Sequence, residues 1–154
     1  MSKVMNLVSL TAPSTDLRRV LPESQFLRAL SLERKRAERS QTRFVVMQLD
    51  VATLAQNATH ENLLLRTVFS LVHSVRETDI VGWYKQRSAL GVIFAELGKA
   101  DTLSVLSALQ TKMLGTLRSA LRAEEVERIN IAFCCYPEDD KAQETRQTIG
   151  VNGR

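Results

Sequence analysis

The stretch Asp79-Ile-Val-Gly-Trp-Tyr-Lys-Gln-Arg-Ser-Ala-Leu-Gly-Val-Ile-Phe94 contains two short apolar runs, residues 79–84 and 90–94, with a polar segment between them. Short runs rich in β-branched and aromatic residues favour strands. Two such runs joined by a few polar residues are typical of a hairpin. The sequence therefore predicts a β-hairpin whose turn lies within Lys85 to Ala89.

The segments on either side of this hairpin have helical periodicity. Residues 62–76 precede it, and a second helix is expected to begin after Asp101, whose side chain suits a helix N-cap. Each helix has a stripe of apolar residues at a spacing of three and four. The first stripe contains Leu64, Leu65, Val68, Leu71, Val72 and Val75, and the second contains Leu103, Leu106, Leu109, Met113, Leu117 and Leu121.

Two more apolar runs, residues 44–49 and 129–135, predict the first and last strands along the chain, and residues 22–39 predict a helix before them. The order is a helix followed by β-α-β-β-α-β, which defines an α+β, ferredoxin-like split βαβ fold. We expect one sheet with helices on one face. The domain is expected to span residues 21–137, after an extension at 1–20 and before a polar tail at 138–154.

The composition excludes several classes of protein. The 154 residues are 44% hydrophobic and 25% charged, as in a globular domain rather than a disordered chain. No apolar run is long enough to span a bilayer, and the first residues are too weakly apolar for a secretory signal, so a cytoplasmic location is expected. Cys134 and Cys135 are adjacent and are expected to be structural, and with two histidines they make no metal-ligand set.

The net charge of +4 is modest, and six basic residues lie between Arg28 and Arg43. A basic helix can bind nucleic acid or an anionic membrane. Such a helix is more often a solvated face. Aromatic residues make up only 5% of the chain, and so the sequence predicts neither DNA nor RNA as a partner.

The order and spacing of several segments resemble the GGDEF family of diguanylate cyclases. They are Phe26 to Leu30, Arg43 to Asp50, Leu63 to Val68, Arg76 to Val81, and Ile129 to Phe133 with Tyr136 to Asp139. The resemblance covers roughly Leu21 to Asp139. It implies a GGDEF-type single domain in bacterial cyclic di-GMP signalling, and members of this family often work beside exopolysaccharide machinery.

The family's signature is replaced in this chain. At the position of the GGDEF turn stands Lys85-Gln86-Arg87-Ser88-Ala89, so both glycines and both acids are absent. The resemblance implies that members use three carboxylates to hold divalent metal against GTP. Asp50 matches the first of these, whereas Ala52 and Ser88 stand at the other two positions. The sequence therefore predicts no cyclase activity, no catalytic residues, no metal and no cofactor, with Asp50, Lys85, Arg87 and Ser88 as remnants of the active site.

A second site of the family is retained. Arg76 and Asp79 match the RxxD motif, which in the family binds cyclic di-GMP as an inhibitory ligand. An arginine can pair with phosphate or a guanine edge, and an aspartate can accept from guanine N–H groups. The structural alternative is that Arg76 stabilises a helix C-terminus and Asp79 closes a turn.

Two functions follow from the sequence. One is a catalytically inactive receptor that binds cyclic di-GMP through Arg76 and Asp79. The other is a module on the same fold that docks to a protein or forms a homodimer without a nucleotide. An exposed apolar patch around Trp83 and Tyr84 would favour docking.

Overall fold

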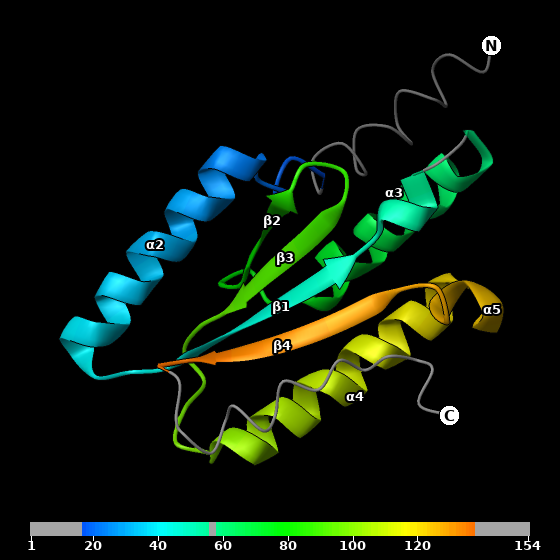
Figure 1. Ribbon diagram of the computed structural model, residues 1–154. Helices are drawn as coiled ribbons and strands as arrows, with labels where there is room; N and C mark the ends of the chain where they lie inside the picture. Colours follow the sequence, from blue (N-terminus) through cyan, green and yellow to red (C-terminus); the bar gives the residue numbers. More distant parts are fainter. Residues whose placement is uncertain (1–16, 56–57, 138–154) are drawn as a thin grey trace, which may run out of the picture.

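The computed structural model describes residues 17–55 and 58–137, and Figure 1 shows their arrangement. Most of the predicted extension and all of the predicted tail lie outside these residues. The elements are α2 (Glu23–Ser40), β1 (Phe44–Asp50), η1 (Ala52–Ala55), α3 (Ala58–Ser74), β2 (Ile80–Lys85), β3 (Ala89–Phe94), α4 (Thr102–Ala120), α5 (Ala123–Val126) and β4 (Asn130–Tyr136).

The four strands form one antiparallel sheet in the order β2-β3-β1-β4. Strands β1 and β2 are parallel to each other, with β3 between them, as the split βαβ arrangement requires. The β2–β3 hairpin is formed as predicted, and its ladder pairs Gly82 with Gly91. The predicted α+β class and the β-α-β-β-α-β order of elements along the chain are thus confirmed.

Helices cover both faces of the sheet, and the expectation of helices on one face is wrong. Helices α3 and α4 lie on one side, and α2 crosses the other side (Figure 1). The reason lies in β1, where Val45 and Met47 face α3 and α4 while Phe44 and Val46 face α2. A strand that is apolar on both faces requires two covering layers.

The larger core lies between the sheet and helices α3 and α4. Leu71 of α3, Met113 and Leu117 of α4 and Phe133 of β4 are all at most 1% exposed. The predicted stripe of α4 is wrong at its first position, because the Leu103 side chain is 65% exposed. Leu103 lies in the first turn of α4, with its side chain turned away from the larger core.

Asp101 is the N-cap of α4, as predicted. Its Oδ1 accepts the backbone N–H of Ser104 at 2.8 Å, and its Oδ2 accepts the Ser104 hydroxyl at 3.0 Å. These two hydrogen bonds lower the pKa of Asp101 below its ordinary value of 3.8. The folded state is therefore stabilised by the ionised cap.

Substituting Asp101→Asn is expected to flatten the acid side of the stability curve. The stabilisation due to the lowered pKa is fully present above pH 3.8 and is lost as the pH falls through the lower pKa of the folded state. Urea unfolding at a series of pH values should show a constant difference between the two proteins above about pH 5 and a shrinking one below about pH 4. A difference that stays constant down to pH 2 would contradict this account.

The residues just before α2 pack onto the sheet and onto α3. Leu17 and Val20 lie against the larger core. Leu21 forms a parallel bridge to Gly82 at the free edge of β2. Arg19 donates to the carbonyl oxygens of Val72 at 3.2 Å and Arg76 at 3.1 Å. Residues 17–20 therefore pack with the rest of the domain, and Arg19 contacts the C-terminal end of α3.

Among the described residues, no helix is both long and apolar enough to span a bilayer.

Candidate functional site

Arg76 and Asp79 lie together in the turn between α3 and β2, as the sequence predicted. The backbone N–H of Asp79 donates to the Arg76 carbonyl at 3.0 Å. In return, the backbone N–H of Arg76 donates to Asp79 Oδ2 at 2.9 Å. This reciprocal pair closes the turn.

The two side chains bind each other. Arg76 Nη2 donates to Asp79 Oδ1 at 2.8 Å, and Arg76 Nε donates to Asp79 Oδ2 at 3.3 Å. The Asp79 side chain is 1% exposed and the Arg76 side chain 48% exposed. The hydrogen bond to Asp79 raises the pKa of Arg76 against an opposing effect of burial. The Asp79 carboxylate is therefore directed into the protein, against the Arg76 guanidinium.

Arg76 also connects the turn to the sheet. Its Nη2 donates to the carbonyl oxygen of Ala95, just after β3, at 2.6 Å. Arg19 donates to the Arg76 carbonyl, and Arg76 therefore links the end of α3, the start of β2 and the end of β3. The guanidinium therefore has a structural role, although about half of the Arg76 side chain is exposed to solvent.

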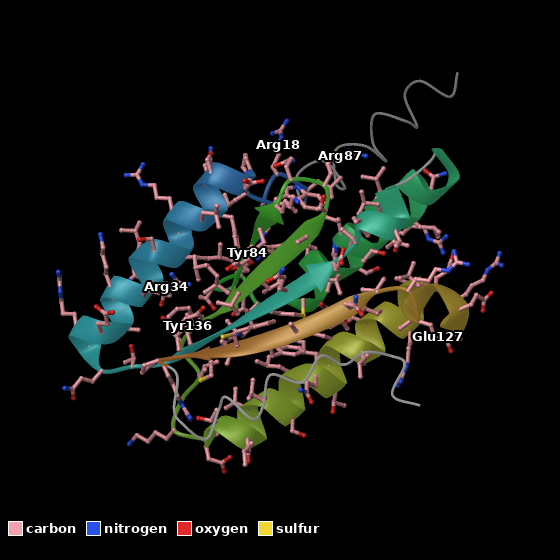
Figure 2. The ribbon with its side chains drawn as sticks, viewed as in Figure 1. Arg18, Arg34, Tyr84, Arg87, Glu127 and Tyr136 are labelled. Carbon is pink, nitrogen blue, oxygen red and sulfur yellow. The ribbon has the colours of Figure 1, made fainter. Side chains whose placement is uncertain are left out.

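The turn at Lys85 to Ala89 is formed without glycine. The N–H of Ser88 donates to the Lys85 carbonyl at 2.9 Å, and the Ser88 carbonyl accepts from Val51 N at 2.8 Å. Arg87 has φ 61°, a left-handed conformation that costs a non-glycine residue about 1 kcal/mol. Arg87 is labelled at the tip of this turn in Figure 2.

The same turn is attached to the start of α2. Gln86 N donates to Glu23 Oε1 at 2.7 Å, and Glu23 N donates to Gln86 Oε1 at 3.3 Å. These reciprocal bonds join residues 63 positions apart. They give Gln86 a structural partner, which the sequence did not indicate.

Asp50 ends β1 beside this turn, opposite Ala89 in the β1–β3 ladder. Its Oδ1 accepts the N–H of Ala52 at 3.1 Å and so caps the short helix η1. Across residues 17–55 and 58–137, no group of three or more His, Cys, Asp or Glu side chains is placed to hold a metal ion. Asp50 therefore ends the first strand, as expected from the sequence, and belongs to no such group among the described residues.

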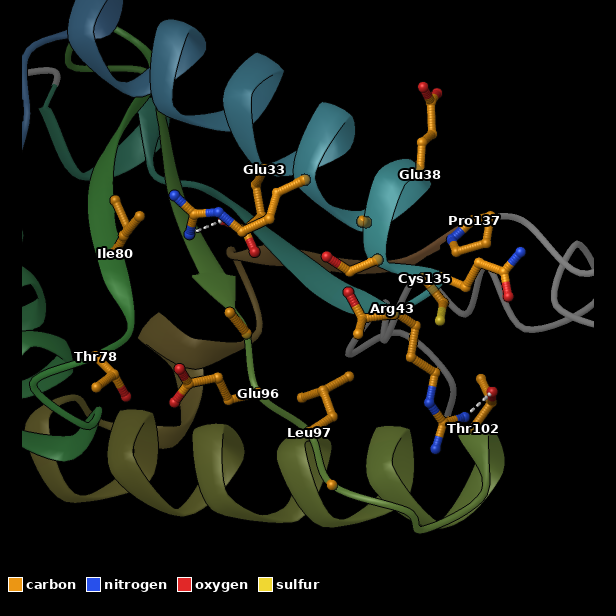
Figure 3. A pocket seen from close by; sticks show the side chains of 17 residues that line it. Glu33, Glu38, Arg43, Thr78, Ile80, Glu96, Leu97, Thr102, Cys135 and Pro137 are labelled. Carbon is orange, nitrogen blue, oxygen red and sulfur yellow. Dashed lines mark hydrogen bonds and ion pairs between the residues drawn. The ribbon is translucent and has the colours of Figure 1, made fainter.

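Figure 3 shows a cavity of about 860 Å³ at the opposite end of the sheet. The C-terminal part of α2, the ends of the strands and the loop before α4 line it. Its charged side chains are mixed in sign: Glu33, Glu38 and Glu96 with Arg36 and Arg43. The lining comes from segments far apart in the chain, and for this reason no sequence motif marks it.

Trp83 and Tyr84 do not form a common exposed patch. Trp83 is half-buried against the larger core, whereas Tyr84 is half-buried on the α2 side, with its ring 6.0 Å from that of Phe26. Adjacent strand residues point to opposite faces. The large exposed apolar side chains of the described residues are Leu27, Leu32, Leu65, Phe69 and Leu103.

No protein-family model and no curated protein matches the chain. Solved structures do. A diguanylate cyclase (DGC) protein from Thermotoga maritima aligns at a TM-score of 0.59 and 22% identity, over 85% of this chain and 92% of its own. The coiled-coil and GGDEF domain of DgcB from Caulobacter crescentus, in complex with c-di-GMP, aligns at 0.55 and 14%, over 97% and 91%. The diguanylate cyclase SiaD from Pseudomonas aeruginosa, in complex with its activator SiaC, aligns at 0.54 and 12%, over 97% and 62%.

These likenesses, with the strand order and the hairpin described above, establish the fold. The chain has the fold of the GGDEF domains, which diguanylate cyclases share. Since a fold hosts different functions, the activity has to be argued from the residues at each site.

Proposed function

We propose that this chain is a catalytically inactive signalling domain of the GGDEF fold that acts by docking to a protein. The observation that carries the first part is the turn Lys85 to Ala89, whose last residue lies opposite Asp50 in the β1–β3 ladder and whose Ser88 carbonyl accepts from Val51 N. A metal held against a triphosphate needs several oxygen ligands from carboxylates. Among the described residues, Asp50 belongs to no group of three or more potential metal ligands and does not supply them.

Incubation with GTP and Mg²⁺ or Mn²⁺ is expected to yield no cyclic di-GMP. Chromatography of the nucleotides measures this directly, with an active diguanylate cyclase in a parallel reaction as the control. The variant Asp50→Ala separates a trace activity of this chain from a contaminant. Turnover that depends on the metal and disappears in Asp50→Ala would contradict the proposal.

Two features support docking as the mode of action. Asp79, the residue that would accept from guanine, is buried and already binds the Arg76 guanidinium. On α3, Leu65 and Phe69 are 48% and 36% exposed at a spacing of four residues, which is a common form of a protein-binding helix face. The complex of SiaD with SiaC is an example of this fold bound to a protein.

A receptor for cyclic di-GMP is the second candidate. The half-exposed Arg76 guanidinium favours it, because an exposed arginine can bind phosphate without releasing its carboxylate partner. Thr78 and Glu96, close to this turn, line the cavity described above. DgcB provides a case of the same fold in complex with c-di-GMP.

Calorimetric titration with cyclic di-GMP is expected to give no binding heat at ligand concentrations up to about 100 µM, well above the Kd of a micromolar site. Arg76→Ala and Arg19→Ala form a matched pair. Each removes a guanidinium that donates a hydrogen bond at this turn, Arg76 to the Asp79 carboxylate and Arg19 to the Arg76 carbonyl. Micromolar binding that is lost in Arg76→Ala and kept in Arg19→Ala would establish the receptor instead.

A further inference from the structure

Helix α2 has one side packed on the sheet and one side exposed. Phe26, Leu30 and Ala37 lie against the strands and are at most 4% exposed. In the described part of the chain, α2 is the only helix on this face of the sheet, while α3 and α4 cover the other face (Figure 1). The side of α2 that lies opposite these three residues is exposed along the whole helix.

Three cations and a leucine form a line along this exposed side. Arg28, Leu32, Lys35 and Arg39 follow one another at spacings of four, three and four residues, which places them on one face of a helix. All four side chains are exposed, and the line extends over about 16 Å at the rise of an α-helix. We call the three cations the basic line of α2. They lie opposite the sheet, and their stems therefore do not cover it.

The acidic residues of α2 do not neutralise the basic line. Glu23 accepts from the N–H of Gln86 at 2.7 Å, and the buried Glu33 accepts from Arg36 Nη1 at 3.2 Å. Glu38 lines the cavity at the end of the sheet. Within residues 17–55 and 58–137, the cations of the basic line form no ion pair. Their charge is therefore available to a partner of opposite sign.

We propose that the exposed side of α2 binds the surface of a lipid bilayer that contains anionic phospholipids. The basic line supplies guanidinium and ammonium donors for the lipid phosphates. Leu32, which is 52% exposed within the line, and Leu27, which is 38% exposed on its flank, supply apolar surface for the boundary of the acyl chains. Cations and apolar side chains on one helix face are typical of a helix that lies on a membrane surface.

The exposed leucines favour a bilayer over a nucleic acid. Nucleic acids are bound by cations and by aromatic side chains that stack on the bases. The aromatic residue of α2 is Phe26, which is fully buried. A bilayer surface offers phosphate groups and hydrocarbon at adjacent depths, so it matches both kinds of side chain on this face.

The bilayer and a protein partner would occupy different sides of the domain. Leu65 and Phe69 lie on α3, on the other face of the sheet from α2 (Figure 1). A domain bound through α2 therefore leaves the exposed side chains of α3 free for a protein. The inference is separate from the docking function proposed above, and neither depends on the other.

Flotation of the full chain with lipid vesicles tests the proposal. Binding is expected to vesicles of phosphatidylcholine with roughly 30% phosphatidylglycerol and not to phosphatidylcholine alone. It should weaken steeply as the salt concentration rises from about 0.1 M to about 0.5 M, because salt screens the charges. Replacing the basic line (Arg28→Gln, Lys35→Gln and Arg39→Gln together) is expected to weaken binding by about a hundredfold, since each cation contributes about fivefold near an anionic surface.

The control variant makes the same change of charge on the other side of the sheet. It replaces with Gln three exposed cations that lie on α4 or directly after it: Lys112, Arg118 and Arg122. This variant is expected to keep the affinity of the unaltered chain for the anionic vesicles. Far-UV circular dichroism checks that both triple variants are folded.

Leu32→Ser tests the apolar part of the contact. It is expected to weaken binding by about threefold to tenfold, because about half of the side chain remains to be buried. The loss should be similar at each salt concentration, since salt does not screen apolar burial. Leu103→Ser is the matched control, because Leu103 is 65% exposed on α4, and it is expected to leave binding unchanged.

Three results would overturn the proposal. The first is the absence of binding to the anionic vesicles at low salt. The second is an equal loss of binding in the two triple variants, or in Leu32→Ser and Leu103→Ser. The third is binding to RNA or to an acidic protein that the basic line mediates while the vesicles are not bound, which would assign this face of α2 to that partner.

Discussion

Substituting Phe26→Ala is expected to lower the free energy of unfolding by about 3–5 kcal/mol, the range for removing a fully buried aromatic side chain. Phe26 is 0% exposed and lies against Gly82 and Gly91, which are partners across the β2–β3 ladder. A Cβ atom at Gly82 would lie 2.6 Å from Cδ1 of the ring, and one at Gly91 would lie 2.5 Å from Cζ. The glycine pair thus forms the recess that receives the ring, and chemical denaturation measures the loss.

A double-mutant cycle tests the recess itself. Gly91→Ala alone should cost about 1–3 kcal/mol, because the added methyl group collides with the ring. In the Phe26→Ala background the same methyl group enters the space left by the ring. The free energy of unfolding should therefore fall in the double variant by at least about 1 kcal/mol less than the sum of the two single losses. Gly115→Ala is the control: no atom lies within 4 Å of its Cβ position. Additive effects at Phe26 and Gly91 would show that the ring does not depend on the glycines.

Substituting Arg76→Ala is expected to lower the free energy of unfolding by about 2 kcal/mol, since it leaves the buried Asp79 carboxylate with fewer donors. The value is below that for a fully buried pair because the Arg76 side chain is half-exposed and hydrated. Removing both partners together, in Arg76→Ala with Asp79→Ala, should cost less than the sum of the two single substitutions. Chemical denaturation of the four proteins gives the coupling energy.

The Arg122–Glu124 pair provides the control for this cycle. Its N–O distance is 3.8 Å, and its two side chains are 80% and 65% exposed. Arg122→Ala is expected to cost less than about 1 kcal/mol, as is usual for a surface ion pair. Equal costs for Arg122→Ala and Arg76→Ala would contradict the structural role of the Arg76–Asp79 pair, and the guanidinium of Arg76 would then be better explained by ligand binding.

Much of the fold could be predicted because its signals are local. The hairpin at residues 79–94 follows from two apolar runs and a short polar segment, and Asp101 marks the start of α4 through its own side chain. The error at Leu103 arose because helical spacing indicates which residues share a face but not which of them a neighbouring element covers. The apolar residues on both faces of β1 indicate two covering layers, and this signal was available in the sequence.

The candidate site was predictable only in part. The spacing of Arg76 and Asp79 placed them at one corner, but their pairing depends on the burial of Asp79 and on the Ala95 carbonyl that also accepts from Arg76. The bonds between Glu23 and Gln86 join residues 63 positions apart, and no local pattern indicates them. The same holds for the cavity at the end of the sheet opposite the hairpin turn, whose charged residues come from α2, from Arg43 just before β1 and from the loop before α4.

The sequence by itself determined the order of the main helices and strands and the hairpin with its turn at Lys85 to Ala89. These properties depend on residues close together in the chain, where backbone periodicity and side-chain chemistry are sufficient. The tertiary structure alone decided the side of the sheet that α2 covers, the pairing of Arg76 with Asp79, and the bonds between Glu23 and Gln86. Those outcomes depend on contacts between distant segments, whose free energies local periodicity does not encode.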